Sequence, residues 1–193
     1  MWVRSAAIRP VPPYAQLPDE ALGAVEQWLG SDEAETEGRL HEAFERFEHS
    51  QPALSQRVSR ALGRSGDEVA LALGYYLSLV IWLGFEQAFA QRLTELSGTE
   101  VDGVEQSLKL DEQLRGQDPV EAVDSDDVVA MEQPHAVEFI HEHLEAALEA
   151  HAGNVDVDAV HAMYRVVLIE VLALSYAVRP PEDFVGTGSE ICA

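Results

Sequence analysis

Apolar residues recur every three or four positions along most of the chain, which is the spacing of helices that bury one face. Proline and aspartate at segment starts and glycine at segment ends divide this pattern into separate helices. No series of alternating apolar and polar runs with hairpin turns occurs, so the sequence predicts an all-α fold. The expected helices cover residues 18–30, 32–49, 52–63, 67–97, 99–116, 134–153 and 156–178.

The fourth of these helices contains an uncharged run, VALALGYYLSLVIWLGF, at residues 69–85. Its length is near the lower limit for a membrane-spanning helix, about 17 residues. Two glycines, the pair Tyr75-Tyr76 and a polar helical continuation instead favour a helix at the centre of a bundle. We therefore expect a long buried central helix over about 67–97 and no association with a membrane.

The pattern predicts a single bundle domain of about six to seven helices over residues 18–178. An extended, proline-rich arm at residues 1–17 precedes the domain. A tail at residues 179–193 follows it, because two consecutive prolines forbid further helix. Residues 117–133, within the domain, are acidic, and we expect them to form a linker with one short helical turn.

A faint internal repeat accompanies these helices. A Gln-Pro pair starts a helix at residue 51 and again at residue 133, and the spacing from Asp67 to Tyr75 recurs from Asp156 to Tyr164. Two related helical hairpins whose second helices pack together in the core would explain this pattern. Chance similarity between two amphipathic hairpins would explain it equally well.

The chain is strongly acidic, with 35 Asp and Glu residues against 12 Lys and Arg residues and a formal net charge of −23. Such a surface repels nucleic acid and anionic lipid, and it attracts basic proteins, polyamines or divalent cations. Acidic surfaces poor in lysine also arise throughout the proteins of salt-adapted or GC-rich organisms. Charge alone therefore does not choose a function.

The single cysteine, Cys192, allows neither an intramolecular disulfide nor a multi-cysteine zinc site. The N-terminal segment MWVRSAAIRPVPPYAQLP lacks the apolar core of a secretory signal. Both features favour a cytoplasmic protein. The sequence does not determine the oligomeric state and leaves a homodimer open.

The stretch PHAVEFIHEHLEAALEAH, residues 134–151, contains the Glu138-x-x-His141 spacing with which ferritin-like bundles hold paired irons. On a helical wheel at about 100° per residue, the glutamates of this stretch face away from its apolar arc. A second Glu-x-x-His is missing, whereas a di-iron site needs ligands that converge from four helices. The sequence therefore favours a solvated face and predicts no cofactor. The alternative is a divalent metal held by Glu138, His141 and His143.

Glu170 lies in VVLIEVLALSYAV, a helix that is apolar on nearly all sides. A buried carboxylate needs a partner or has a raised pKa. One interpretation is an ion pair or hydrogen bond with an arginine or tyrosine of a neighbouring helix, or exposure at a flank. The other is a polar pocket in the bundle, lined by Glu170, Glu86 and His161, that binds a ligand or a metal.

Common enzyme motifs are absent from the sequence, which has no P-loop, no Gly-x-Ser-x-Gly elbow and no His-Glu-x-x-His. The leading hypothesis is a non-catalytic, acidic helical protein that binds a basic protein partner through its negatively charged surface. The alternative is a bundle that binds a small molecule or a metal, with or without catalysis.

Overall fold

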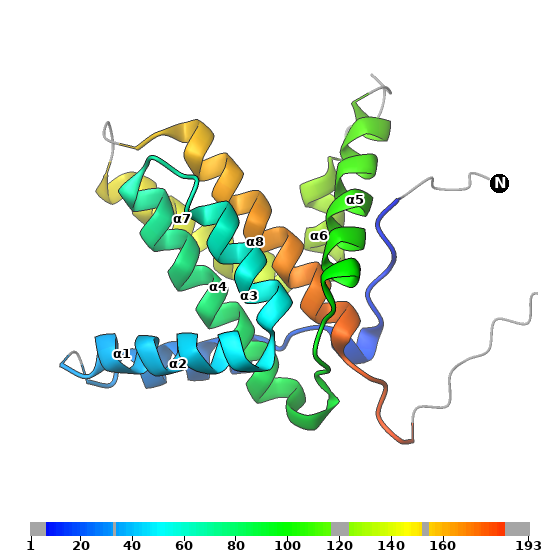
Figure 1. The fold of residues 1–193 in the computed structure, drawn as a ribbon, viewed down its shortest axis with the longest axis horizontal. Coiled ribbons are helices and arrows are strands. Elements are labelled where there is room, and N and C mark those ends of the chain that lie inside the picture. The colour runs from blue at the N-terminus through cyan, green and yellow to red at the C-terminus, as the bar shows by residue number, and fades with distance from the viewer. Residues whose placement is uncertain (1–6, 33, 117–123, 152–154, 184–193) are drawn as a thin grey trace, which may run out of the picture.

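The computed structural model describes residues 7–32, 34–116, 124–151 and 155–183, and in these ranges the fold is an all-α bundle (Figure 1). Apart from two 3-10 turns, η1 (Pro13–Ala15) and η2 (Ala90–Arg92), and one isolated bridge between Leu93 and Val178, the described residues contain no other regular elements than α-helices. The all-α prediction is confirmed. The helices are α1 (Asp19–Gly30), α2 (Thr36–Ser50), α3 (Pro52–Leu62), α4 (Glu68–Phe89), α5 (Gly98–Arg115), α6 (Ser125–Glu132), α7 (Pro134–Ala150) and α8 (Val157–Ala177).

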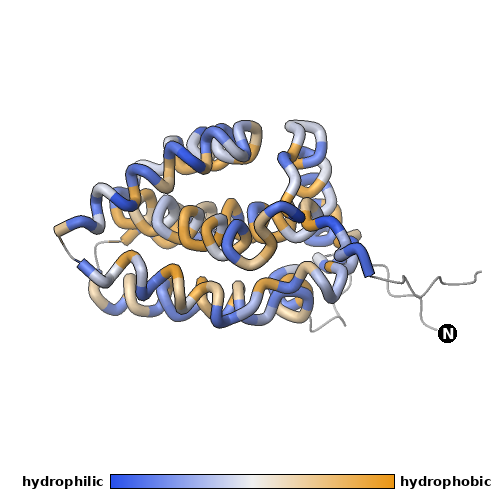
Figure 2. Tube along the Cα trace, turned by 90° about the horizontal axis from the view of Figure 1, so that it is seen from below, coloured by the Kyte–Doolittle hydropathy of each residue, from blue (hydrophilic) through white to orange (hydrophobic). Residues whose placement is uncertain are grey.

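Helices α4 and α8 form the centre of the bundle and pack against each other (Figure 1). Helices α1 and α2 contact α4, whereas α3 and α5 contact α8. Figure 2 shows hydrophobic residues concentrated in the middle layer, with hydrophilic residues along the outer faces of the surrounding helices. The arrangement follows from the sequence pattern, because the two most apolar helices need burial on all sides.

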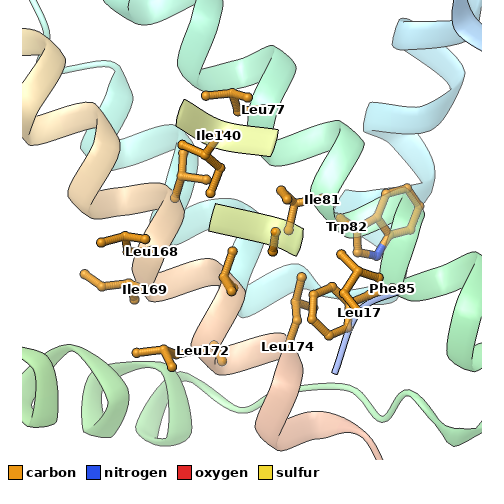
Figure 3. Close-up of a cluster of buried hydrophobic side chains, with 14 of the residues drawn as sticks. Leu17, Leu77, Ile81, Trp82, Phe85, Ile140, Leu168, Ile169, Leu172 and Leu174 are labelled. Carbon is orange, nitrogen blue, oxygen red and sulfur yellow. The ribbon is translucent and has the colours of Figure 1, made fainter. Parts of the chain in front are cut away.

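The middle of α4 is deeply buried, since every residue from Leu77 to Phe85 is buried. The indole of Trp82 packs against Phe47 of α2, with ring centroids 5.2 Å apart. The predicted buried central helix is therefore present. Figure 3 shows side chains of α4 beside side chains of α7 and α8 in this core, including Leu77, Ile81, Ile140, Leu168, Ile169 and Leu172.

The segment Glu68–Arg92 also has the length and mean hydropathy, 1.6, of a membrane-spanning helix. Of its most apolar window, 61% is buried inside the bundle. The core helix of a soluble protein meets the same criteria of length and composition. The expected absence of membrane association therefore stays a prediction.

The central helix is shorter than the sequence pattern predicts, because α4 ends at Phe89 and not near Ser97. Ala90 has a φ of 43°, a left-handed conformation that a right-handed helix cannot continue. After η2 the chain runs beside the end of α8, where the N–H of Thr94 donates to the carbonyl oxygen of Ala177 at 3.0 Å. The chain leaves the helix to make these tertiary hydrogen bonds, which local propensity does not contain.

A buried glutamine, Gln51, holds the segment that leaves α4. Its side-chain amide donates to the carbonyl oxygen of Thr94 at 2.9 Å and accepts from the N–H of Leu96 at 2.9 Å. Both polar groups of the amide are thus satisfied inside the bundle, as burial requires. The side chain of residue 51 therefore positions the start of α5.

Gln133 holds a second segment in the same way. It donates to the carbonyl oxygen of Ala15 at 2.8 Å and accepts from the N–H of Leu17 at 2.8 Å, just before α1. Its backbone angles, φ −136° and ψ 67°, are close to those of Gln51, φ −135° and ψ 59°. Each Gln-Pro pair thus starts a helical hairpin and clamps the segment that enters another helix.

These clamps relate the first four helices to the last four. Helix α1 packs on α4 as α5 packs on α8, α2 packs on α3 as α6 packs on α7, and α3 contacts α8 as α7 contacts α4. The second helices of the two hairpins, α4 and α8, pack together, as the repeat pattern in the sequence predicts. The repeat extends beyond the hairpins, to four helices in each half.

The acidic stretch at 117–133 contains a full helix, α6, where the sequence pattern predicts a linker with one turn. Residues 117–123 lie outside the described residues. Helix α6 forms because Val129 on its inner face is buried and because Asp124 caps its N-terminus. The acidic composition was interpreted as a sign of a linker, but Asp residues are equally favourable in the first turn of a helix.

The proline-rich arm at its described residues, 7–17, lies against the bundle. The side chains of Ile8, Val11, Ala15 and Leu17 are buried in the core. The predicted tail is described only over residues 179–183, so most of it, with Cys192, lies outside the described residues.

Candidate functional site

The candidate site is a cavity of about 420 Å³ between α6, α7 and α8. We call it the acidic cavity. Three aspartates stand at its α6 side, and apolar side chains of α7 and α8 form its walls. Its lining residues are Asp124, Asp126, Asp127, Ala130, His141, Leu144, Leu148, Val157, Val160, His161 and Tyr164.

A capping box at the start of α6 brings the aspartates to this cavity. The side chain of Asp124 accepts from the N–H of Asp127 at 3.0 Å, and the side chain of Asp127 accepts from the N–H of Asp124 at 3.1 Å. The two orphan donors at the helix start are thus satisfied by carboxylates, which also suit the positive end of the helix dipole. Sequence reasoning missed this box, although its acidic residues at N-cap and N3 are visible in the sequence.

The acidic cavity lies where the first half of the molecule has an aromatic contact. Aligning Gln51 with Gln133 places Phe44 opposite Asp126, and aligning Asp67 with Asp156 places Tyr75 opposite Tyr164. Phe44 packs edge-on against Tyr75, with ring centroids 6.0 Å apart. Asp126 is too small to make the equivalent contact with Tyr164. The space beside Tyr164 therefore stays open.

The electrostatics of the cavity follow from its partial burial. Burial raises the pKa of Asp126, and the negative charge of Asp124 raises it further. Burial also raises the pKa of Tyr164, with the nearby aspartates acting in the same direction. A hydrogen bond of 2.9 Å joins the Tyr164 hydroxyl to Nε2 of His141, and the two rings are stacked. The cavity thus concentrates negative charge beside an apolar surface.

This combination suits a ligand that carries a positive charge on an apolar stem. The carboxylates attract the charge, and the apolar walls gain from covering the stem. Val157 at the mouth is 72% exposed, so apolar surface is already available to a partner.

The candidate metal ligands do not converge. Glu138 is exposed and His141 bonds to Tyr164. Both ring nitrogens of His143 have protein partners, since Nδ1 lies 2.9 Å from the carbonyl oxygen of Phe139 and Nε2 lies 3.0 Å from Oε1 of Glu26. Within the described part of the chain, no group of three or more His, Cys, Asp or Glu side chains could hold a metal ion.

The structure also separates Glu170, Glu86 and His161. Glu86 forms an ion pair with Arg46 at the surface. His161 lines the acidic cavity, and Glu170 lies nine positions further along α8, about 13 Å by the rise of a helix. The three residues therefore do not share a pocket, although His161 does line one.

Glu170 is completely buried between α8 and α4. Burial raises its pKa to about 8, and the hydroxyl of Ser78 acts in the opposite direction. No described side chain makes a well-formed hydrogen bond to either carboxyl oxygen of Glu170. The Ser78 hydroxyl also has no well-formed hydrogen bond with a described residue. Neither an arginine nor a tyrosine partner is found among the described residues, so the raised pKa favours the protonated carboxyl group at neutral pH.

A second carboxylate, Asp111 of α5, is also buried, and its burial was not predicted from the sequence. Its oxygens accept from Nε of Arg115 at 2.5 Å, from the Ser125 hydroxyl at 2.8 Å and from the N–H of Ala7 at 3.0 Å. Burial alone would raise the pKa of Asp111, but these hydrogen bonds outweigh it and lower the pKa. Asp111 thereby ties together α5, α6 and the N-terminal arm.

Comparisons with protein-family models, curated proteins and solved structures find no match to this chain.

Proposed function

We propose that the protein is a non-catalytic interaction protein that binds a basic protein partner, with the acidic cavity as the centre of the contact. The observation that carries this proposal is the placement of three aspartates over apolar walls. Lysine and arginine side chains have an apolar stem and a cationic end, and they bury the stem while the charge stays near carboxylates. Such a side chain matches both parts of the cavity.

The charge of the whole chain supports the same partner. A formal net charge of −23 attracts a basic protein over distances beyond direct contact and speeds its association. Two apolar residues that line the cavity, Leu148 and Val157, are exposed and offer contact area for apolar neighbours of the cationic residue. The partner chemistry is therefore a basic amphipathic segment, with leucine-like and lysine- or arginine-like side chains on one face.

The test is a titration with a synthetic helical peptide that carries lysines beside a leucine face, with oligolysine of equal length as the comparison. Backbone amide NMR should show the largest shifts in α6, α7 and the start of α8. Oligolysine should bind about tenfold more weakly, because it leaves the apolar walls uncovered.

Three variants make the test specific to the cavity. Asp126→Asn removes a lining charge, and Asp126→Phe fills the space as Phe44 does in the first half. Glu149→Gln removes an equal charge from an exposed residue outside the lining. The first two should weaken the amphipathic peptide by about tenfold or more, and the control by less than about twofold.

Equal weakening by Asp126→Asn and Glu149→Gln would contradict the proposal, because binding would then depend on overall charge alone. Spermidine that binds at the same amides as tightly as the peptide would favour a small-molecule site instead. Either result would contradict the proposal that the acidic cavity binds a basic protein partner.

A further inference from the structure

A second cavity, of about 380 Å³, lies between α3, α5 and α8 and is basic. We call it the arginine cavity. Four of the 12 basic side chains in the chain line it, together with one glutamate, which gives the lining a net charge of +3. Its lining residues are Leu54, Arg57, Val58, Arg60, Ala61, Arg64, Glu105, Ala162, Arg165, Val166 and Ile169.

Two of the four arginines are held by acidic neighbours. Arg57 forms an ion pair with Glu105 of α5. Nη2 of Arg165 lies 2.9 Å from Oε2 of Glu112, while its Nε is buried without a hydrogen-bond partner among the described residues. A buried guanidinium nitrogen that lacks an acceptor is costly, and a bound anion would satisfy it.

The other two arginines, Arg60 and Arg64, form no ion pair with any described residue, although the chain has 35 acidic residues. Arg60 lies in the last turn of α3, and Arg64 lies two residues beyond the end of the helix, yet both side chains line the same cavity. Like charges that line one cavity repel each other, so their convergence there costs stability.

Three of the four arginines, those of the first half, have no arginine counterpart in the second half. Aligning Gln51 with Gln133 places Phe139, Glu142 and Ala146 opposite Arg57, Arg60 and Arg64. In that half, Phe139, the counterpart of Arg57, packs against the ring of His143, with centroids 4.2 Å apart. The shared scaffold therefore does not require arginines at these positions.

We propose that the arginine cavity binds a small anionic ligand, a phosphate or carboxylate group carried on an apolar body. Arg60 and Arg64 would hold the anion, because guanidinium groups bind both oxyanions through paired hydrogen bonds. The apolar body would cover Val58, Val166 and Ile169 on the cavity wall. An adjoining cavity of about 250 Å³ shares Arg64 and Val166 and gives this body further room.

This site is separate from the acidic cavity. The arginine cavity takes Ala162, Arg165, Val166 and Ile169 from α8, whereas the acidic cavity takes Val157, Val160, His161 and Tyr164 from it. At about 100° per residue, these two sets lie on different faces of α8. The two proposals can therefore succeed or fail independently.

The test is calorimetric and NMR titration of the full chain with hexyl phosphate, hexanoate, inorganic phosphate and hexyltrimethylammonium. The anionic amphiphiles should bind at one site, with amide shifts in α3 and in the middle of α8. Inorganic phosphate should bind about tenfold more weakly than hexyl phosphate, because it leaves the apolar wall uncovered. The stronger of hexyl phosphate and hexanoate identifies which oxyanion the site prefers.

The variant Arg60→Gln/Arg64→Gln should weaken the anionic amphiphiles by about tenfold or more. The control Arg39→Gln/Arg92→Gln removes the same charge from outside the cavity and should change affinity by less than about twofold. Both residues of the test pair are exposed, so the variant should melt close to the parent. Melting curves of both variants check this directly.

Three results would overturn the proposal. The first is no binding of either anionic amphiphile at millimolar concentration. The second is an equal loss of affinity in both double variants, which would place the effect in overall charge. The third is binding of hexyltrimethylammonium at the same amides as tightly as hexyl phosphate, which would show that the site does not select an anionic group.

Discussion

Replacing Glu170 by glutamine should make the protein more stable at neutral and alkaline pH. Glu170 is completely buried on α8, and burial raises its pKa from 4.5 to about 8. The charged form is therefore disfavoured in the folded state and ordinary in the unfolded state. Glutamine has nearly the same shape as the protonated acid, so the substitution removes the ionisation and changes the packing little.

The sign and size follow from the two pKa values. Below pH 4.5 both states are protonated, and ionisation of Glu170 costs no stability. Between pH 4.5 and about 8 the unfolded state loses the proton and the folded state keeps it, so stability falls by about 1.4 kcal/mol per pH unit. The loss is about 3 kcal/mol at pH 7 and levels off near 5 kcal/mol above pH 8.

The assay is urea denaturation of the parent and of Glu170→Gln at pH 5, 7 and 9, with Glu149→Gln as an exposed control. The difference in unfolding free energy between Glu170→Gln and the parent should grow by about 4 kcal/mol in favour of the variant from pH 5 to pH 9. Other carboxylates titrate equally in all three proteins and cancel from this difference.

A difference that changes by less than about 1 kcal/mol over this range would refute the reasoning, because the folded pKa of Glu170 would then be near its unfolded value. The same growth in Glu149→Gln would also refute it, by assigning the effect to net charge. The first outcome would mean that water or a charged partner reaches the carboxyl group.

Four further predictions test the fold and the surface. Trp82→Ala should lower the unfolding free energy by about 3–5 kcal/mol in urea denaturation, because it empties the core of α4. Asp111→Ala should cost about 3–5 kcal/mol in the same assay, since it breaks a buried ion pair and leaves Ser125 without its acceptor. Glu138→Gln/His141→Gln should melt close to the parent, and elemental analysis of both should find no stoichiometric iron, manganese or zinc that the substitution removes. The melting temperature should rise with added NaCl, because screening relieves repulsion within a chain of net charge −23; a flat profile up to about 1 M would contradict this.

The apolar pattern of the sequence predicted the helices whose positions follow from burial. It did not predict the helix ends and buried polar residues that depend on side-chain hydrogen bonds. An uncharged run such as 69–85 can only be satisfied by burial on all sides, so its central place was predictable. The end of α4 was not, because it depends on the amide of Gln51, between α2 and α3, reaching residues 94–96. No local pattern contains that contact.

The inner face of α5 shows the same limit. Leu110 and Leu114 look like core residues in the sequence, yet they are 49% and 40% exposed, while Asp111 between them is buried. The spacing Val101, Val104, Leu108 and 111 is the better helical match, but an aspartate at its end speaks against burial. Only the tertiary partners of Asp111 reverse that argument.

Neither cavity could be predicted from a motif, because each exists through a difference between two similar halves. The core positions of the halves agree: Gln51 and Gln133 make the same clamps, and Val58 and Ile140 are both buried at equivalent places. The halves diverge at the boundary between core and surface, where an aspartate stands in place of Phe44 and arginines of α3 stand in place of an aromatic cluster on α7.

Divergence at such positions changes ligand chemistry without disturbing the scaffold. Losing an aromatic ring at a core centre would cost several kcal/mol, but at the edge the space opens to solvent and the cost is smaller. The same edge positions receive charge freely, since a carboxylate or guanidinium can remain hydrated while its stem covers apolar wall. A bundle of two similar halves can thus carry an acidic cavity on one face of α8 and a basic cavity on another. In this molecule the acidic cavity has Asp126 where the first half has Phe44, and the arginine cavity has Arg57 where the second half has Phe139.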